Sequence, residues 1–212
     1  MQTANTYSHE TCAFCLAISH AKLSRISPSG IGRHAAYFLN QELSFKLWVV
    51  LSGIELTLRN RGSAYLIAEF GEELFSTEAW RLGEASKSRI SKVLARSKDG
   101  QLSTDALITQ LPLSFWTLLF SKRMESTTWP VLMRNLLSDS APTSRAVIYT
   151  RLLETLELRN RIAHHEVVLK DRFKGALERQ LELLSWVCND FRQEVEARIE
   201  FSLHPVESLH EQ

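Results

Sequence analysis

The chain has 212 residues, which fits one compact domain or one domain with a small helical appendage. Its 44% hydrophobic and 23% charged residues are ordinary proportions for a globular protein, and no apolar run approaches the roughly 18 residues of a membrane span, so no membrane association is expected. The net charge of +1 gives no sign of a nucleic-acid binder that works through overall charge, although arginine outnumbers lysine by 17 to 8.

Residues 1–30 are expected to form an N-terminal helical segment. Their opening, MQTANTYSHE, has no basic stretch leading into an apolar one, so we expect no secretory signal and a cytoplasmic location. Cys12 and Cys15 form a Cys-x-x-Cys pattern, but further zinc ligands at suitable spacing are missing, and a redox motif would need a neighbouring βαβ unit. With Cys188 they are expected to be reduced thiols, and no metal or cofactor is implied.

Helical periodicity dominates residues 31–200, which we expect to form one all-α domain. The stretch 37–68 predicts a long helix, and the pair Phe70-Gly71 predicts its end. Apolar residues recur three or four positions apart along this helix and so share one face; they are Leu39, Leu43, Leu47, Val50, Ile54 and Leu58.

The middle of the chain predicts shorter helices separated by caps, turns and prolines. The first is expected after the cap at 76–78; it carries Ile90, Val93 and Leu94 and ends at the turn 98–100. The second is expected at 111–120, with Pro112 in its first turn. The third is expected from Trp129-Pro130 to about Leu137.

The polar stretch 138–144 is the best linker candidate in the chain. A helix is expected from 145 to about 162, and a last long helix from 169 to about 199, with apolar residues from Phe173 to Phe191 on its buried side. The tail 201–212 is expected to be flexible. No stretch shows the period-two alternation of a hairpin, so few or no strands are expected.

The chain contains one short sequence pattern twice. Residues 56–61 and 156–161 share the pattern Leu-x-Leu-Arg-Asn-Arg, each on a predicted helix with a glutamate close by. Six residues do not establish a duplication, but a helical bundle could bring the two Arg-Asn pairs near each other.

The second copy of the pattern leads into residues suited to metal-free RNA cleavage. That reaction needs a base for the ribose 2′-OH, a cation for the phosphorane and an acid for the leaving 5′-oxygen; histidine and arginine fit these needs. Arg159, Asn160, His164 and His165 supply them within seven residues. Five positions at about 100° each separate Arg159 from His164 by about 140°, so the two converge only if the helix ends or distorts near Ala163.

The full string Arg-Asn-Arg-Ile-Ala-His-His-Glu at 159–166 resembles the signature Arg-Asn-x-x-x-His of the Abi-like (abortive infection) family of bacterial phage-defence proteins, within the HEPN superfamily. The segment Glu55-x-x-x-Arg59-Asn60, followed by Phe70-Gly71, is similar to the first motif of that family. The segment Leu113-Ser114-Phe115-Trp116-x-x-Leu119, followed by Trp129, is similar to its central aromatic motif. The resemblance covers roughly residues 33–190. It departs where Ser114 stands in place of an expected glycine.

The resemblance implies a HEPN-like bundle of long antiparallel helices with short inserted ones, and a metal-independent endoribonuclease toxin that leaves a 2′,3′-cyclic phosphate. It also implies RNA as the partner, a homodimer with two signatures facing one cleft, and control by an antitoxin protein, a noncoding RNA or a phage component. Residue by residue, Arg159 would contact the scissile phosphate, Asn160 would hold the backbone or the substrate, His164 would be the acid or base, and His165 would share or orient that role.

Candidate RNA contacts are Arg161, Glu55, Arg59 and Asn60. For Glu55 and Arg59 the simpler alternative is an ion pair within the helix at i, i+4. For the Arg-His segment the alternative is a helix end where cationic side chains complement the dipole and cap free carbonyls.

Trp116 and Trp129 could stack on RNA bases, but their apolar surroundings favour core packing. Three functions remain open at this point: an RNA-cleaving defence protein, a non-catalytic HEPN-like module that binds RNA or protein, and a helical scaffold. The RNA sequence and the trigger cannot be predicted from these residues.

Overall fold

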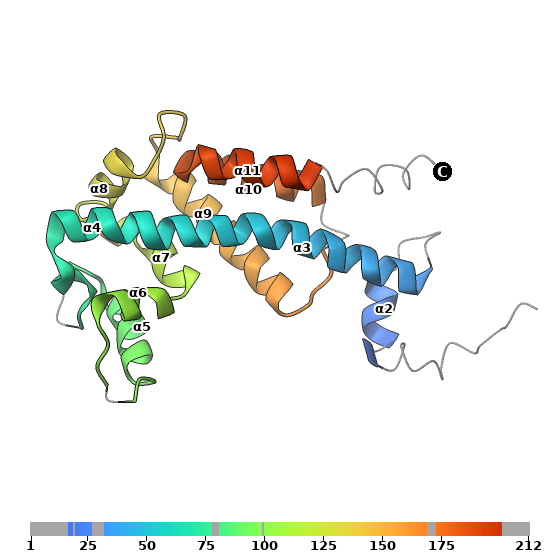
Figure 1. Ribbon diagram of the computed structural model, residues 1–212, viewed down its shortest axis with the longest axis horizontal. Coiled ribbons are helices and arrows are strands. Elements are labelled where there is room, and N and C mark those ends of the chain that lie inside the picture. The colour runs from blue at the N-terminus through green and yellow to red at the C-terminus, as the bar shows by residue number, and fades with distance from the viewer. Residues whose placement is uncertain are drawn as a thin grey trace, which may run out of the picture.

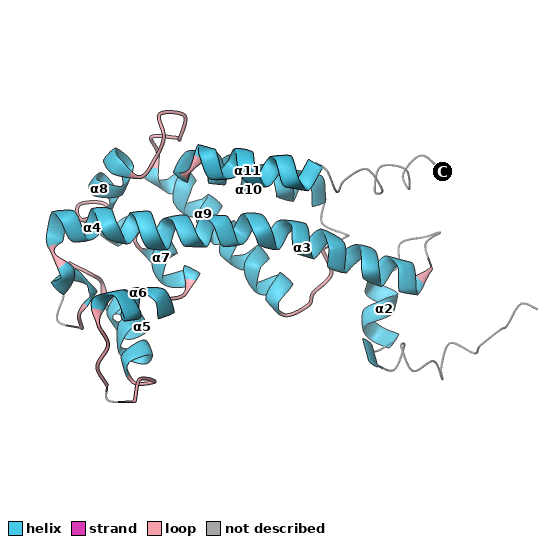
Figure 2. Cartoon of the chain, viewed as in Figure 1, coloured by secondary structure: helices cyan, strands magenta, loops and turns pink. Residues whose placement is uncertain are grey.

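The computed structural model describes residues 17–18, 20–26, 32–77, 81–98, 100–168 and 173–200. Within these ranges every regular element is a helix, which confirms the all-α fold class (Figure 2). The helix α2 (His20–Ile26) lies in the expected N-terminal segment. The predictions for Cys12, Cys15 and the tail 201–212 fall outside the described residues.

One long helical rod forms the axis of the fold (Figure 1). α3 (Arg33–Thr57) continues through a π-helical turn, η1 (Leu58–Gly62), into α4 (Ser63–Phe70). The predicted apolar stripe is buried from Leu43 to Leu58, whereas Leu39 is only partly buried. The helix predicted at 37–68 is therefore confirmed, with the π-turn as an unexpected interruption.

Gly71 ends the rod, as the sequence predicted. Its φ of 81° lies in the left-handed region that glycine adopts without a steric penalty, and its N–H donates to the carbonyl of Ile67 at 2.8 Å.

Short helices follow the rod and pack at one end of it (Figure 1). They are η2 (Glu72–Phe75), α5 (Glu84–Leu94), α6 (Thr104–Gln110), α7 (Leu113–Leu118), η3 (Lys122–Met124) and α8 (Thr128–Asn135). Pro112 immediately precedes α7, and Trp129 and Pro130 lie in the first turn of α8, close to where they were expected.

Two details of this region differ from the sequence prediction. The cap at 76–78 does not start α5: Ser76 Oγ donates back to the carbonyl of Glu73, and the helix begins only after Gly83. The helix α6 was not predicted; Ser103 caps it by accepting a hydrogen bond from the N–H of Ala106 at 3.3 Å.

The polar stretch 138–144 connects α8 to α9 (Arg145–Ala163) and is attached to the body of the fold at its start. The N–H of Ser138 donates to the carbonyl of Trp186 at 2.8 Å, and its hydroxyl donates to the carbonyl of Ser185 at 3.3 Å. These bonds tie the beginning of the stretch to the end of α10 (Phe173–Val187).

The prediction of a single long helix at 169–199 is wrong. The chain forms α10 and then α11 (Asn189–Glu200), which reverses direction at Cys188 and returns beside α10 (Figure 1). Leu184 and Phe191, on either side of the reversal, both lie against Gly53 of α3; a Cβ at Gly53 would be 3.2 Å from the Phe191 ring. The lack of a side chain at Gly53 lets the Phe191 ring of α11 pack closely against α3.

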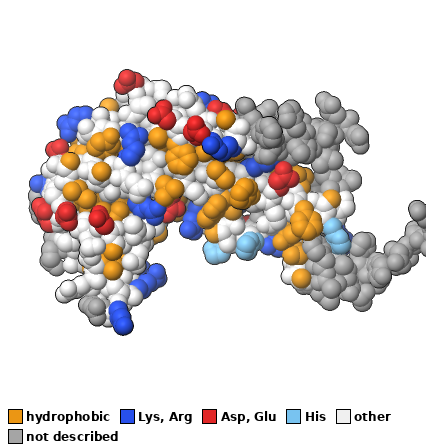
Figure 3. Space-filling view, viewed as in Figure 1, with side chains coloured by type: hydrophobic (Ala, Val, Ile, Leu, Met, Phe, Trp, Pro, Cys, Tyr) orange, Lys and Arg blue, Asp and Glu red, His pale blue; other side chains and the backbone are white. Residues whose placement is uncertain are grey.

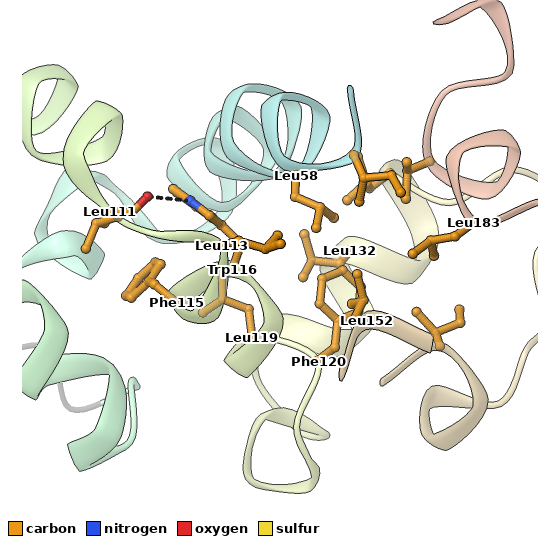
Figure 4. Packing of buried hydrophobic residues seen from close by; sticks show 14 of the residues in the cluster. Leu58, Leu111, Leu113, Phe115, Trp116, Leu119, Phe120, Leu132, Leu152 and Leu183 are labelled. Carbon is orange, nitrogen blue, oxygen red and sulfur yellow. Dashed lines mark hydrogen bonds between the residues drawn. The ribbon is translucent and has the colours of Figure 1, made fainter. Parts of the chain in front are cut away.

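The hydrophobic core lies where α7, α8 and α9 meet the rod (Figure 4). Trp116 is 1% exposed and donates its indole N–H to the carbonyl of Leu111 at 3.2 Å, and Trp129 is 8% exposed. Both tryptophans are therefore core residues, and neither offers a face to an RNA base. No described helix combines the length and apolarity that crossing a bilayer requires.

Candidate functional site

The C-terminal end of α9 has the geometry of a Schellman motif, the hydrogen-bonded helix ending in which one residue adopts a left-handed backbone. The N–H of His165 donates to the carbonyl of Ile162 at 2.9 Å, and the N–H of Glu166 donates to the carbonyl of Arg161 at 2.9 Å. His165 occupies the left-handed position with a φ of 56°, where glycine is usual. The helix thus ends directly after Ala163, close to the end predicted from the sequence, and His164 still makes the helical hydrogen bond from its N–H to the carbonyl of Asn160 at 3.0 Å.

Arg161 fastens the loop that follows this helix end. Its Nη2 donates to the carbonyl of Val167 at 2.6 Å, and its Nε lies 3.4 Å from the carboxylate of Glu166. From the other side, the Oδ1 of the buried Asn40 on α3 accepts a hydrogen bond from the N–H of Val168 at 2.7 Å. Arg161 therefore holds the loop in place. The RNA contact expected of it stays a prediction.

Arg159 is held by an aromatic ring. Its guanidinium carbon lies 5.6 Å from the ring centroid of Trp48 on α3, within the range of a cation–π contact. Its Nε is buried without a hydrogen-bond partner, and among the described residues no carboxylate lies within ion-pair distance of it. The ring thus positions the guanidinium, which has no counter-charge within the part of the chain that the structure describes.

Asn160, His164 and His165 are exposed. Figure 3 shows histidine side chains at the lower edge of the molecule, where Figure 1 shows the end of α9, beside exposed hydrophobic and basic side chains. The carbonyl of Asn160 accepts the N–H of His164 at 3.0 Å, so its backbone supports the turn. These imidazoles can be reached from solvent, as proton transfer to a large substrate requires.

The arginines of the first copy of this pattern lie on the π-turn η1 and donate hydrogen bonds to backbone carbonyls of other elements. Arg59 Nη1 donates to the carbonyl of Thr109 at 3.2 Å, and Arg61 Nη1 donates to the carbonyl of Val187 at 2.6 Å. A hydrogen bond with the Tyr65 hydroxyl raises the pKa of Arg61, so this arginine stays charged at any physiological pH. Asn60 is exposed on the same turn.

The ion pair expected between Glu55 and Arg59 does not form; no such pair occurs in the described part of the chain. The spacing i, i+4 aligns two residues only in an α-helix, and the wider turn that begins at Leu58 rotates Arg59 away from that alignment. Glu55 is half-buried on α3.

The two Arg-Asn pairs do not meet. Arg159 lies over Trp48, whereas Arg59 reaches α6, and the two contacts are 11 residues apart along the rod, or about 16 Å at 1.5 Å per residue. Only the second copy therefore combines arginine with histidine.

A cavity of about 290 Å³ lies between α9 and α10, beside the loop that Arg161 fastens. Its lining includes Glu154, Glu157, Arg161 and Arg179 together with the buried amide of Gln180. Within the described ranges no cluster of three or more histidine, cysteine or acidic side chains could hold a metal ion.

Three aromatic residues of α3 were not anticipated from the sequence. Phe38 and Phe45 are 62% and 69% exposed, and Trp48 is 37% exposed while it supports Arg159. A signal was present, because these residues lie off the stripe of apolar residues that the periodicity assigns to the core.

Comparisons with family models, with curated proteins and with solved structures find no match to this chain.

Proposed function

We propose that the end of α9 is the active site of a metal-independent endoribonuclease of the Abi-like, HEPN type, acting on single-stranded or structured RNA in phage defence. One observation carries the proposal: an exposed histidine pair at a helix end lies five residues after an arginine that is fixed by Trp48 and bears no counter-charge among the described residues. The sequence resemblance supplies the reaction, and the geometry supports the roles of the residues.

In the proposed reaction the ribose 2′-oxygen attacks the neighbouring phosphorus while the bond from phosphorus to the 5′-oxygen breaks. His164 takes the proton from the 2′-OH or gives one to the leaving 5′-oxygen, with His165 as the partner for the other transfer. Arg159 neutralises the charge on the phosphorane oxygens with its planar N–H donors. The products are a 2′,3′-cyclic phosphate and a 5′-hydroxyl, with no net gain or loss of protons.

The carbonyl of Asn160, which accepts the His164 N–H, and the left-handed turn at His165 place both histidines at the end of α9. Asn160 is the exposed polar group next to Arg159 and is available to the sugar or the phosphate. We further propose that the protein acts in the cytoplasm, where its RNA substrate is found, and that an antitoxin protein or a noncoding RNA restrains it.

A cleavage assay tests the proposal. Purified protein is incubated with end-labelled RNA in EDTA, beside the variants His164→Ala and Arg159→Ala and the control Arg123→Ala, which removes an exposed arginine of η3. We expect cleavage by the wild type and the control and a loss of at least about a hundredfold in the two site variants. Products should end in a cyclic phosphate.

The alternative function is a non-catalytic module that uses the same arginine to grip phosphate. It predicts RNA binding by the wild type without cleavage, and weaker binding by Arg159→Ala alone. A scaffold would neither cleave nor bind.

A further inference from the structure

The positive charge of the chain is concentrated in one segment. Residues 81–100, which contain α5, carry six lysine and arginine residues against two acidic ones, a net charge of +4. The whole chain carries only +1, so the remaining residues together carry −3. Positive charge that is clustered on one element can attract a polyanion even where the charge of the whole chain does not.

Three of these cations are exposed at the C-terminal end of α5 and in the turn after it. They are Lys92, Arg96 and Lys98, and we call them the α5 basic end. None of the three forms an ion pair with a described carboxylate, whereas Lys87, in the first turn of the same helix, lies 3.4 Å from Glu84. The α5 basic end is therefore a group of solvated positive charges without counter-charges in the described ranges.

The helix dipole does not account for all three charges. A cation in the last turn of a helix interacts favourably with the dipole, but this effect is lost within about one turn. Lys92 lies in the last turn, whereas Arg96 and Lys98 lie beyond the end of α5 at Leu94. The N–H of Arg96 donates to the carbonyl of Val93 at 3.1 Å, so the coil of the chain continues to this residue. Lys92 and Arg96 are thus like charges four positions apart, which repel each other unless an anion lies between them.

A neighbouring arginine fixes α5 to the body of the fold. Arg89 Nε donates to the hydroxyl of Ser114 on α7 at 3.2 Å, and Arg89 Nη1 donates to the carbonyl of Ala85 at 2.8 Å. The helix α7 in turn packs against α9, which carries the candidate site. The α5 basic end is therefore held at a defined position relative to the end of α9.

The α5 basic end and the candidate site lie on the same side of the rod. Figure 1 shows α5 and the end of α9 projecting from the rod in one direction. In Figure 3 the lower edge of the molecule is indented between the lobe that contains α5 and the histidines, and basic side chains border this indentation. Arg59 joins the rod to this lobe, because its Nη1 donates to the carbonyl of Thr109 on α6.

We propose that the α5 basic end binds the phosphate backbone of the RNA strand that is cut at the end of α9. The strand then follows the indented edge from the histidines to α5. Phosphate contacts of this kind position a strand without reading its sequence. Binding of phosphates by α5 follows from its charges, whereas the connection with cleavage rests on the proposed function.

The salt dependence of RNA binding tests the contact. The variant Lys92→Gln with Arg96→Gln removes two charges from the α5 basic end. Its affinity is measured over a series of salt concentrations with a labelled 2′-O-methyl oligonucleotide, which cannot be cleaved by attack of the 2′-oxygen. Each phosphate contact with a single strand contributes about −0.7 to the slope of log K against log salt, so the slope should become shallower by about 1.4. The affinity at physiological salt should fall about fivefold to twentyfold.

A second pair of substitutions controls for net charge. Arg134→Gln with Arg198→Gln also removes two charges from exposed side chains, but these arginines lie on α8 and α11, across the rod from α5 (Figure 1). Each pairs with a glutamate at the surface, so its loss should change stability little. This control should keep the slope and the affinity of the wild type, and circular dichroism confirms that all the proteins are folded.

The outcomes separate this inference from the proposed function. A slope that is unchanged in the α5 variant, or that changes equally in the control, overturns the contact whether or not RNA is cleaved. If the wild type binds RNA through α5 but cleaves none, the contact stands and the endoribonuclease is wrong.

Cleavage assays test whether one strand reaches both places. The α5 variant should cleave a long RNA at least about fivefold more slowly at low substrate concentration, because part of the binding energy is lost. This loss should shrink for a dinucleotide, whose single phosphate cannot occupy the end of α9 and α5 together. An equal loss for both substrates would overturn the shared strand and leave the endoribonuclease intact.

Discussion

Arg159 of α9 and Trp48 of α3 form a cation–π pair that joins the candidate site to the rod, with 5.6 Å between the guanidinium carbon and the ring centroid. The pair links two segments that are more than a hundred residues apart in the chain. It fixes the position of the cation while leaving its charge unpaired among the described residues, and this combination suits a phosphate ligand.

Replacing Trp48 should therefore reduce RNA cleavage by displacing Arg159. We expect Trp48→Leu to lower kcat/KM about fivefold to tenfold, since such a contact is worth about 1 kcal/mol when partly exposed, and Trp48→Phe to lower it less. Steady-state kinetics on a defined oligonucleotide measure the effect. An equal loss in the leucine and phenylalanine variants would argue against a role for the ring face.

The left-handed backbone of His165 should lower the free energy of unfolding. Because glycine avoids the clash of a Cβ in this region, His165→Gly is expected to raise the free energy of unfolding by about 1 kcal/mol, even though it removes a side chain. His165→Val should lower it instead. Urea denaturation gives both values, and a destabilised glycine variant would mean that the imidazole makes a compensating contact.

Arg161→Ala should loosen the loop after α9. The variant loses the hydrogen bond to Val167 and the ion pair with Glu166, and the arginine side chain is 28% exposed, so we expect a global loss of only about 1 to 2 kcal/mol. Hydrogen exchange should show the larger effect as faster exchange at residues 164–168. Unchanged exchange there, with Asn40 intact, would mean that Asn40 alone holds the loop.

Gly53→Val should destabilise the contact between α3 and α11. A Cβ added at Gly53 would lie 3.2 Å from the Phe191 ring, so the further methyl groups of valine should cost about 2 to 3 kcal/mol. The double variant Gly53→Val with Phe191→Ala should lose less than the sum of the single variants, because the alanine removes the clash. Denaturant midpoints of the four proteins complete the cycle, and additive losses would contradict the close approach.

The core positions of α3 could be predicted from sequence because one helix period assigns Leu43, Leu47 and Ile54 to one face. The same reasoning located the end of α9, since the Arg-His string fits a helix terminus. It could not predict Trp48 as the support of Arg159, because that contact depends on how two helices cross.

The break at Cys188 was missed for a related reason. Apolar residues continue at helical spacing from Leu184 to Phe191, so periodicity alone joins α10 to α11, and the polar pair Asn189-Asp190 is the only local sign of a new helix start. Both flanking residues reach Gly53 only because the chain turns back between them. A short helix such as α6 is also missed easily, because seven residues hold too few apolar positions to define a period.

The π-turn η1 acts as a one-residue insertion in an otherwise continuous helix. Each residue advances a helix by about 100°, so deleting one residue between Leu58 and Gly62 would let the rod become regular and would swing α4 by about that angle. Leu66, now fully buried, would then point away from the core while α3 kept its own packing. The bulge thus sets the relative rotation of the two halves of the rod, which lets one helix serve two differently oriented packing surfaces.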